Sequence, residues 1–353
     1  MITVTLGKTG ITVDKNGFGA LPIQRISIDD AAFILQKAYN NGIRFFDTAR
    51  AYTDSEMKLN KALKPFPRES FYIASKTQAT TAENFWKDLN TSLEQLGMDY
   101  IDLYQFHNTP FCPRPGDGTG LYEAMLEARD KGLIRHIGIT NHRMGIASEI
   151  IDSGLYETLM FPFSYLSSDE DIDLVRRCKE KNMGFIAMKG LSGGVINNAR
   201  AAFAFMAQFD NVLPIWGCQR ERELDEFIAC QTDPPQMAGE IKDLIEADRK
   251  ELSGIFCRGC GYCMPCPVGI KINDCTRAIL FMKRAPFEKR LGIEFQKEME
   301  KIENCLHCNK CKSKCPYGLD VPTLLRQNLE DYRKVLKGEI FVGVSADVLR
   351  NKR

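Results

Sequence analysis

The sequence predicts an α/β protein: a (β/α)8 barrel of the TIM type, followed by a smaller, mainly helical domain rich in cysteine. Three observations predict this. Short apolar segments alternate eight times with longer amphipathic segments over residues 1–231. Nine of the thirteen cysteines lie between Cys257 and Cys315. Hydrophobic residues make up 44% of the chain and charged residues 26%, a balance that gives a sizeable core and excludes global disorder.

The predicted strands are short runs of apolar and β-branched residues, each followed by a helical pattern. They cover residues 17–21, 45–48, 71–75, 101–106, 134–139, 158–161, 184–188 and 212–216. The helices cover residues 28–41, 55–63, 82–96, 121–131, 144–153, 168–181, 197–208 and 220–231. In the first helix Ala31, Ile34, Leu35 and Ala38 recur at helical spacing, and Gly42 ends the pattern.

A doubly wound sheet that binds a dinucleotide is the competing architecture. That fold needs a G-x-G-x-x-G turn between its first strand and a helix. Gly17-Phe18-Gly19 lacks the third glycine and is not followed by a helix. The barrel is therefore favoured.

The rest of the chain divides at Asp233-Pro234-Pro235. We predict three parts: the barrel (residues 1–231), a charged linker helix (232–254) and the cysteine-rich domain with a C-terminal tail (255–353). In the last part we expect helices on either side of Pro286 and over residues 321–336.

Charge and hydropathy exclude several classes of partner. The net charge is +1, so we expect no nucleic-acid partner. No apolar stretch is long enough to span a bilayer, so we expect no membrane association. The N-terminal residues show no basic segment leading into a long apolar core, which predicts a cytoplasmic protein.

Four polar residues follow or end successive strands: Asp47, Tyr52, Lys76 and His107. A barrel would place all four at the carboxyl ends of its strands, where barrels hold their catalytic residues. Reduction of a carbonyl by hydride needs a proton for the oxygen. A lysine cation beside a tyrosine lowers the pKa of the phenol, and an aspartate keeps the lysine charged. We therefore predict Tyr52 as proton donor, with His107 orienting the carbonyl.

These residues stand in motifs of a known family. Phe45-Phe46-Asp47-Thr48-Ala49-Arg50-Ala51-Tyr52, then Ser55-Glu56, Ala74-Ser75-Lys76-Thr77 and Ile137-Gly138-Ile139-Thr140-Asn141 resemble the aldo-keto reductase signatures. The resemblance covers residues 1–231 and implies a TIM barrel that binds NADP or NAD. It also implies a small-molecule carbonyl or alcohol as substrate.

The resemblance further implies the residues that hold the nucleotide. Thr140 and Asn141 would contact the nicotinamide carboxamide, and Gly217, Arg220 and Arg222 would hold the adenosine phosphates. Met188 stands where the family usually stacks a tyrosine on the nicotinamide.

The clustered cysteines form two consecutive motifs. Cys257, Cys260, Cys263 and Cys266-Pro267 give C-x2-C-x2-C-x2-C-P, and Cys305, Cys308, Cys311 and Cys315-Pro316 give C-x2-C-x2-C-x3-C-P. The second is the bacterial ferredoxin motif, in which the fourth cysteine ligates the other cluster. The module resembles two-cluster ferredoxin domains. We therefore predict two [4Fe–4S] clusters, one held by Cys257, Cys260, Cys263 and Cys315, the other by Cys266, Cys305, Cys308 and Cys311.

Two alternatives remain open. Eight cysteines could also hold two zinc ions, although zinc ribbons usually present separated C-x2-C pairs. The leading hypothesis is an NAD(P)H-dependent oxidoreductase, coupled or tethered to iron–sulfur electron transfer and able to serve a redox partner protein. The alternative is a redox sensor or electron carrier whose barrel binds nucleotide without turnover.

Overall fold

The computed structural model describes residues 2–252, 256–284 and 288–340. Contacts divide these residues into two units. The barrel unit comprises the chain up to Gly190 and then Asn198–Ala247. The C-terminal unit comprises the short segment Leu191–Asn197 and the chain from Asp248 on. Pro286 and the tail beyond residue 340, for which the sequence makes predictions, lie outside the described residues.

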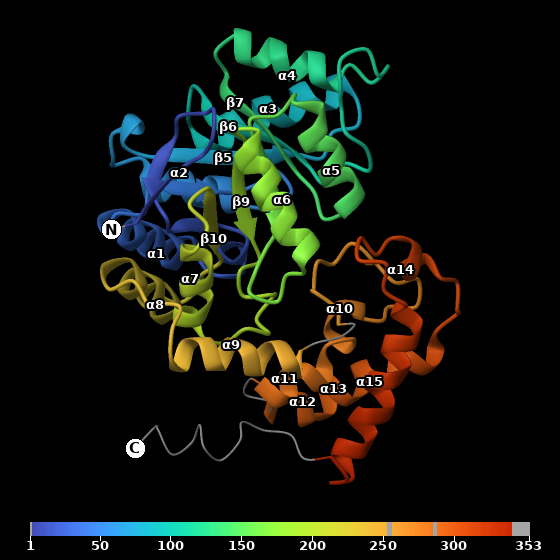
Figure 1. Ribbon diagram of the computed structural model, residues 1–353. Helices are drawn as coiled ribbons and strands as arrows, with labels where there is room; N and C mark the ends of the chain where they lie inside the picture. Colours follow the sequence, from blue (N-terminus) through green and yellow to red (C-terminus); the bar gives the residue numbers. More distant parts are fainter. Residues whose placement is uncertain (1, 253–255, 285–287, 341–353) are drawn as a thin grey trace. The chain divides into compact units, whose positions relative to one another are not determined.

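The barrel unit is a closed ring of eight parallel strands (Figure 1). Each strand pairs with the next in the chain, and the last pairs with the first. The strands are β3 (Gly17–Gly19), β4 (Phe45–Asp47), β5 (Tyr72–Thr77), β6 (Ile101–His107), β7 (Ile134–Thr140), β8 (Thr158–Pro162), β9 (Gly184–Met188) and β10 (Val212–Trp216). The predicted fold class is confirmed, because all eight strands overlap predicted strand segments.

Helices follow the strands as the amphipathic segments predict. They are α1 (Ile28–Asn40), α2 (Ser55–Leu63), α3 (Ala82–Leu96), α4 (Leu121–Asp130), α5 (Met144–Ser153), α6 (Asp169–Glu180), α7 (Ala199–Ala207) and α8 (Glu221–Thr232), with α9 (Glu240–Glu251) after them. Local signals set their ends. The Ser27 side chain accepts the amide N–H of Asp30, and Ser168 forms a capping box with Asp171.

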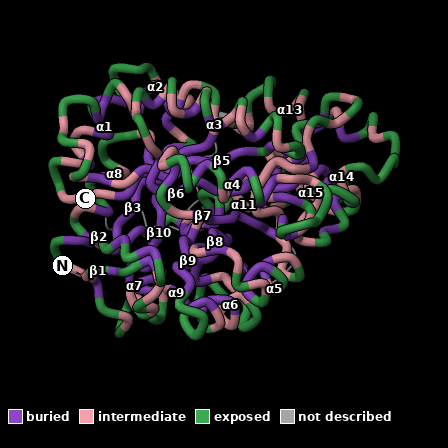
Figure 2. The backbone as a smooth tube through the Cα atoms, turned by 90° about the horizontal axis from the view of Figure 1, so that it is seen from above, coloured by how far each residue is buried: buried purple, intermediate pink, exposed green. Residues whose placement is uncertain are grey.

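A short hairpin precedes the barrel and was not predicted. Strands β1 (Thr3–Thr5) and β2 (Thr12–Asp14) pair antiparallel. A Cβ on Gly184, at the start of β9, would lie 2.9 Å from Leu6, so the hairpin closes the amino-terminal end of the barrel. Most residues of the barrel strands are buried (Figure 2). The carboxyl ends are therefore the side left for a site.

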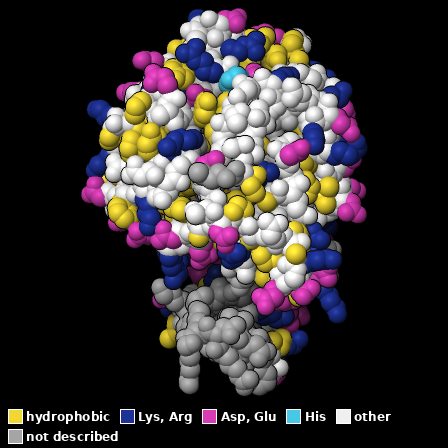
Figure 3. All heavy atoms as spheres, turned by 60° about the vertical axis from the view of Figure 1, so that its left-hand side comes forward, with side chains coloured by type: hydrophobic (Ala, Val, Ile, Leu, Met, Phe, Trp, Pro, Cys, Tyr) yellow, Lys and Arg dark blue, Asp and Glu magenta, His cyan; other side chains and the backbone are white. Residues whose placement is uncertain are grey.

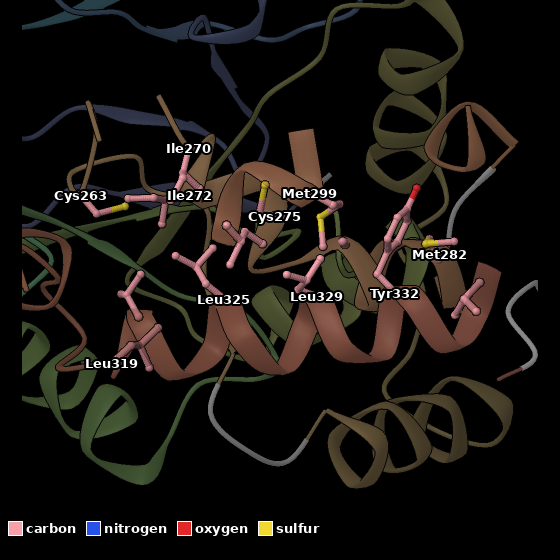
Figure 4. Close-up of a cluster of buried hydrophobic side chains, with 14 residues drawn as sticks. Cys263, Ile270, Ile272, Cys275, Met282, Met299, Leu319, Leu325, Leu329 and Tyr332 are labelled. Carbon is pink, nitrogen blue, oxygen red and sulfur yellow. The ribbon is translucent and has the colours of Figure 1, made fainter. Parts of the chain in front are cut away.

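The C-terminal unit packs short helices against one long helix. The helices are α10 (Ile272–Cys275), α11 (Ala278–Arg284), α12 (Glu288–Leu291), α13 (Ile293–Glu300), α14 (Lys310–Ser313) and α15 (Val321–Leu336). Figure 4 shows Leu325, Leu329 and Tyr332 on the side of α15 that faces Ile272 and Met299. This face forms a core separate from that of the barrel.

The surface is of mixed charge. Acidic and basic side chains are interspersed on the face drawn in Figure 3, as a net charge of +1 would lead one to expect. Among the described residues, no helix has the length and apolar character needed to cross a membrane.

We predict that Gly138→Ala destabilises the barrel by about 1–3 kcal/mol, the usual cost of overpacking. A Cβ at this position of β7 would lie 2.9 Å from Gln105 Cγ and 3.0 Å from Leu103 Cδ1. Urea unfolding followed by tryptophan fluorescence measures the change, because both tryptophans, Trp86 and Trp216, lie in the barrel unit.

Gly145→Ala is the matched control. No atom lies within 4 Å of a Cβ at this position in α5, so we expect no loss of stability and a gain of up to about 1 kcal/mol. Equal stability of the two variants would contradict the packing argument.

Candidate active site and iron–sulfur module

Strand register brings the predicted catalytic residues to one end of the barrel. Asp47 is the last residue of β4 and His107 the last of β6, while Lys76 lies one residue from the end of β5. The register pairs Asp47 with Ala74 and His107 with Thr140. Tyr52 lies in the loop between β4 and α2.

A buried ion pair forms the centre of this group. Lys76 Nζ donates to Asp47 Oδ2 at 2.7 Å and to the Thr48 carbonyl oxygen at 2.6 Å. Both charged side chains are nearly inaccessible to solvent, with 1% and 4% exposed. Burial lowers the pKa of Lys76 and raises the pKa of Asp47, and the attraction between the two charges opposes both shifts.

The aromatic residues stand beside this ion pair. Lys76 Nζ lies 5.2 Å from the centroid of the Tyr52 ring. The rings of Tyr52 and His107 meet edge to face, with their centroids 5.7 Å apart. The structure therefore brings together all four residues of the predicted group.

A second buried carboxylate supports Lys76, and sequence reasoning gave it no role. Glu56, in α2, is 1% exposed. It accepts a hydrogen bond from Ser75 Oγ at 2.7 Å and pairs with Arg50. Its charge raises the pKa of Lys76. Glu56 follows the sequence motif that contains Asp47, and this position could have suggested a role at the site. Nothing in the sequence showed that its side chain reaches Ser75 in β5.

Burial keeps two histidines at this end of the barrel neutral. Burial and the charge of Lys76 lower the pKa of His107 to about 3. Burial, with Lys189 and His107 nearby, lowers the pKa of His142 well below its usual value. The Nδ1 atom of His107 is buried and makes no hydrogen bond to the described residues. A neutral ring at this position can donate or accept a hydrogen bond.

The residues that the family resemblance assigns to a nucleotide lie at the same ends of the strands. Thr140 Oγ1 accepts the amide N–H of Asn108 at 3.1 Å. The Asn141 side chain donates to the Thr109 carbonyl oxygen and accepts the amide N–H groups of His142 and Arg143. Asn141 thus shapes the loop after β7.

The remaining assigned residues follow the last two strands. Met188 ends β9, and its carbonyl oxygen accepts the amide N–H of Phe163. Gly217, Arg220 and Arg222 are exposed; Gly217 directly follows β10, and the two arginines lie at the start of α8. A helix N-terminus flanked by arginines favours an anionic group.

Buried polar atoms without partners support a ligand at this end. Among the described residues, Asn108 Oδ1 at the end of β6 and Trp216 Nε1 at the end of β10 are buried and make no hydrogen bond. Such atoms are costly unless a ligand or water satisfies them. The residues present thus fit a ligand that carries hydrogen-bonding groups.

The C-terminal unit gathers the eight motif cysteines around two cavities. One is lined by Cys257, Cys260, Cys263 and Cys315. The other is lined by Cys266, Cys305, Cys308 and Cys311, with Cys263 also at its border. These are the two groups of four that the sequence assigns to two clusters, each with its fourth thiol from the other motif.

The cysteines are present as free thiols. All thirteen lie within the described residues, and none forms a disulfide. No three potential ligands among the described residues converge on a point that one metal ion could occupy. Burial and neighbouring thiols raise the pKa of Cys263 to about 12. Two cavities, each lined by at least four cysteines, fit two multi-iron clusters, and binding them would release protons.

We predict that His107 and His142 do not titrate between pH 8 and pH 5. Their lowered pKa values place protonation below this range, near pH 3 for His107. Histidine-labelled protein followed by NMR tests this, because the chain has only four histidines. His107→Gln and His142→Gln identify the two signals. A midpoint above pH 5.5 for His107 would contradict the described burial.

Comparison with known proteins assigns both parts of the chain. Residues 15–224 match the family model described as "Aldo/keto reductase family", and residues 256–320 match that of a "4Fe-4S dicluster domain". L-galactose dehydrogenase of Arabidopsis thaliana is 31% identical over 209 residues, which cover 54% of this chain and 66% of that protein. NADH-specific methylglyoxal reductase of Escherichia coli is 24% identical over 229 residues, which cover 56% of this chain and 69% of that protein. The match thus spans less than two thirds of the plant enzyme.

Solved structures show the same barrel. An aldo-keto reductase from Klebsiella pneumoniae in complex with NADPH superposes with a TM-score of 0.59 at 20% identity, covering 70% of this chain and 94% of that one. One from Bacillus halodurans, in its holo form, gives a TM-score of 0.60 at 19% identity, covering 70% and 96%. At these identities the likeness shows the fold alone. The family match, the barrel and the grouped residues agree, and the chain belongs to the aldo/keto reductase family.

Proposed function

We propose that this protein is an NAD(P)H-dependent oxidoreductase that interconverts a small carbonyl compound and its alcohol. The observation that carries the proposal is the buried ion pair of Lys76 and Asp47 beside the rings of Tyr52 and His107. Structural roles rarely need a buried cation next to a phenol at the carboxyl end of a barrel, whereas proton transfer does.

The side chains supply the proton. The nicotinamide, when bound, supplies the hydride for the carbonyl carbon. The Tyr52 hydroxyl gives its proton to the carbonyl oxygen, so the products are the alcohol and the oxidised nucleotide. The Lys76 ammonium stabilises the tyrosinate that remains, and Asp47 holds Lys76 in position and charged. His107, neutral at working pH, orients the carbonyl oxygen through a hydrogen bond.

The nucleotide would lie across the carboxyl ends of the strands. We place its carboxamide at Thr140 and Asn141, its ring against Met188 and its adenosine phosphates near Arg220 and Arg222. Met188 offers an apolar but less rigid cover than an aromatic ring would.

The C-terminal unit would hold two [4Fe–4S] clusters in the two cavities lined by cysteine. Each cluster supplies a site for one electron. The second cavity is bordered by exposed residues, including Leu306, Cys308 and Lys310. The exposed cation Lys310 beside the exposed apolar Leu306 suits an acidic redox partner protein.

A sensor or carrier that binds nucleotide without turnover is the second candidate. Met188 in place of an aromatic residue favours it, because a less rigid cover positions the nicotinamide less well for hydride transfer. An active wild-type enzyme would exclude this candidate.

We predict that Tyr52→Phe loses about 10²- to 10⁴-fold in carbonyl reduction, the usual contribution of a positioned proton donor. NADPH binding should remain, because no proposed nucleotide contact is lost. Steady-state rates on methylglyoxal and other small aldehydes, with nucleotide binding measured by fluorescence, provide the test.

Tyr122→Phe is the matched control, since the Tyr122 hydroxyl donates to the Leu155 carbonyl oxygen outside the site. It should keep the wild-type rate. A Tyr52→Phe variant as active as Tyr122→Phe would remove Tyr52 from the mechanism. A wild-type protein that binds NADPH but reduces no compound of the panel would favour the sensor.

We also predict that anaerobically purified protein contains about eight iron atoms, as two cubanes require. Cys315→Ser should remove ligation from the first cavity and Cys266→Ser from the second, so each should lower the iron content toward about four. Cys275→Ala is the control, because Cys275 is buried in the same unit but lines neither cavity. Zinc in place of iron in the wild type would refute the assignment.

A further inference from the structure

We propose that Arg277 compensates the charge of the cluster held by Cys257, Cys260, Cys263 and Cys315, and that it makes this cluster easier to reduce than the second. The inference rests on the proposed iron–sulfur content. It concerns a residue that no cysteine motif contains and that lies between α10 and α11.

Arg277 is buried within the C-terminal unit among neutral partners. The side chain is 7% exposed. Its Nη1 donates to the Gly193 carbonyl oxygen at 3.0 Å, and its Nε donates to the Asn273 carbonyl oxygen at 2.8 Å. These bonds fix the plane of the guanidinium but do not neutralise its charge.

The guanidinium lies directly against the loop that carries two of the cluster ligands. Gly259 stands between Cys257 and Cys260 and has φ +64°. A Cβ on Gly259 would lie 2.5 Å from both Cζ and Nη1 of Arg277. The Gly259 amide N–H in turn donates to Cys257 Sγ at 3.4 Å. Only a glycine therefore lets the positive charge come this close to the ligand loop.

Within the described part of the chain, this charge has no carboxylate at ion-pair distance. Asp274 and the side chains of Cys257 and Cys260 act on it at longer range, and the positive charge of Arg290 opposes them. An arginine cannot shed its proton, and a buried charge without a counter-charge is strongly unfavourable. A cluster ligated by four thiolates carries net negative charge. The buried guanidinium is thus explained if the first cavity holds such a cluster.

Among the described residues, the second cavity has no comparable group. One charged residue, Lys310, lies on that lining, and it is exposed. Water and salt screen an exposed charge far more than a buried one. The first cavity also has Arg258 on its lining, but that side chain is only partly buried and lies over the Tyr317 ring. The two clusters therefore stand in unequal electrostatic surroundings.

Unequal surroundings give unequal reduction potentials. Each reduction adds one electron, so the cluster becomes more negative by one charge while no bond to the protein changes. A fixed cation in a medium of low dielectric constant stabilises the reduced form and raises the potential. In half-reduced protein the electron would then reside on the first cluster.

The test is a potentiometric titration of full-length, anaerobically purified protein, followed by EPR. We expect Arg277→Gln to make one of the two midpoint potentials more negative and leave the other in place. If the EPR signal with the shifted midpoint is absent from Cys315→Ser, that signal belongs to the first cluster. Arg277→Lys keeps the charge and should return the midpoint most of the way to the wild-type value.

Arg333→Gln is the matched control. Arg333 lies in α15 of the same unit and forms exposed ion pairs with Glu300 and Glu303. Its removal should shift neither potential, which separates the local charge of Arg277 from the net charge of the unit.

The failure of this inference differs from the failure of the proposed function. A wild-type protein without iron would overturn the proposed clusters themselves. Two clusters in the wild type, with neither potential changed in Arg277→Gln or with both changed equally, would overturn only the role of Arg277. If Arg277→Gln cannot assemble the first cluster, Arg277→Lys decides: a normal iron content and midpoint support the role, and loss of the cluster there too overturns it.

Discussion

The ion pair between Lys76 and Asp47 is the interaction on which the proposed active site depends. Two charges leave water when β4 and β5 pair, and a single 2.7 Å hydrogen bond joins them. Breaking such a pair leaves one uncompensated charge in the barrel, at a cost of about 3–5 kcal/mol. The fold therefore holds the Lys76 ammonium beside the Tyr52 ring, where its charge can stabilise the tyrosinate. Asp47 is the partner that both holds the lysine in position and opposes the loss of its proton, with help from the Thr48 carbonyl oxygen and the charge of Glu56.

Buried cations elsewhere in the chain show how this constraint is met. Lys58 is 3% exposed and pairs with Asp54 at 2.8 Å. Within the described residues Lys15 donates to the Phe209 carbonyl oxygen, and burial lowers its pKa to about 8, so it loses its charge more easily than an exposed lysine. A lysine can thus pair or deprotonate, whereas an arginine cannot deprotonate. Arg277 can therefore be stabilised only by a negative charge nearby. The neighbouring cysteines indicate that a cluster bound by their thiolates would supply this charge.

Much of the fold and of the candidate site could be predicted from the sequence. The eight strands were found because buried parallel strands give continuous apolar runs, and the helices because their apolar faces repeat. The grouping of the proposed catalytic residues could be predicted because Asp47, Lys76 and His107 each stand at or next to a strand end. The cysteines were found because their spacing is regular along the chain.

Other features left no such local signal. The hairpin of β1 and β2 has strands of three residues, too short for alternation to be recognised. The hydrogen bond between Glu56 and Ser75 joins residues that are 19 positions apart. Arg277 and Gly193 are 84 positions apart. Contacts of this kind depend on the completed fold, and a single sequence does not record which side chains the fold brings together.

The contact between Arg277 and Gly193 also changes how the second unit should be regarded. Leu191–Asn197 lies in the chain between β9 and α7, yet it belongs to the C-terminal unit. That unit is therefore built from two separate stretches of sequence. A cut after the barrel would leave this segment without the guanidinium that binds its backbone and would leave Arg277 without one of its two carbonyl partners. An isolated C-terminal fragment would keep the Arg277 guanidinium and its bond to Asn273 but would lose the bond to Gly193 that helps to fix its plane.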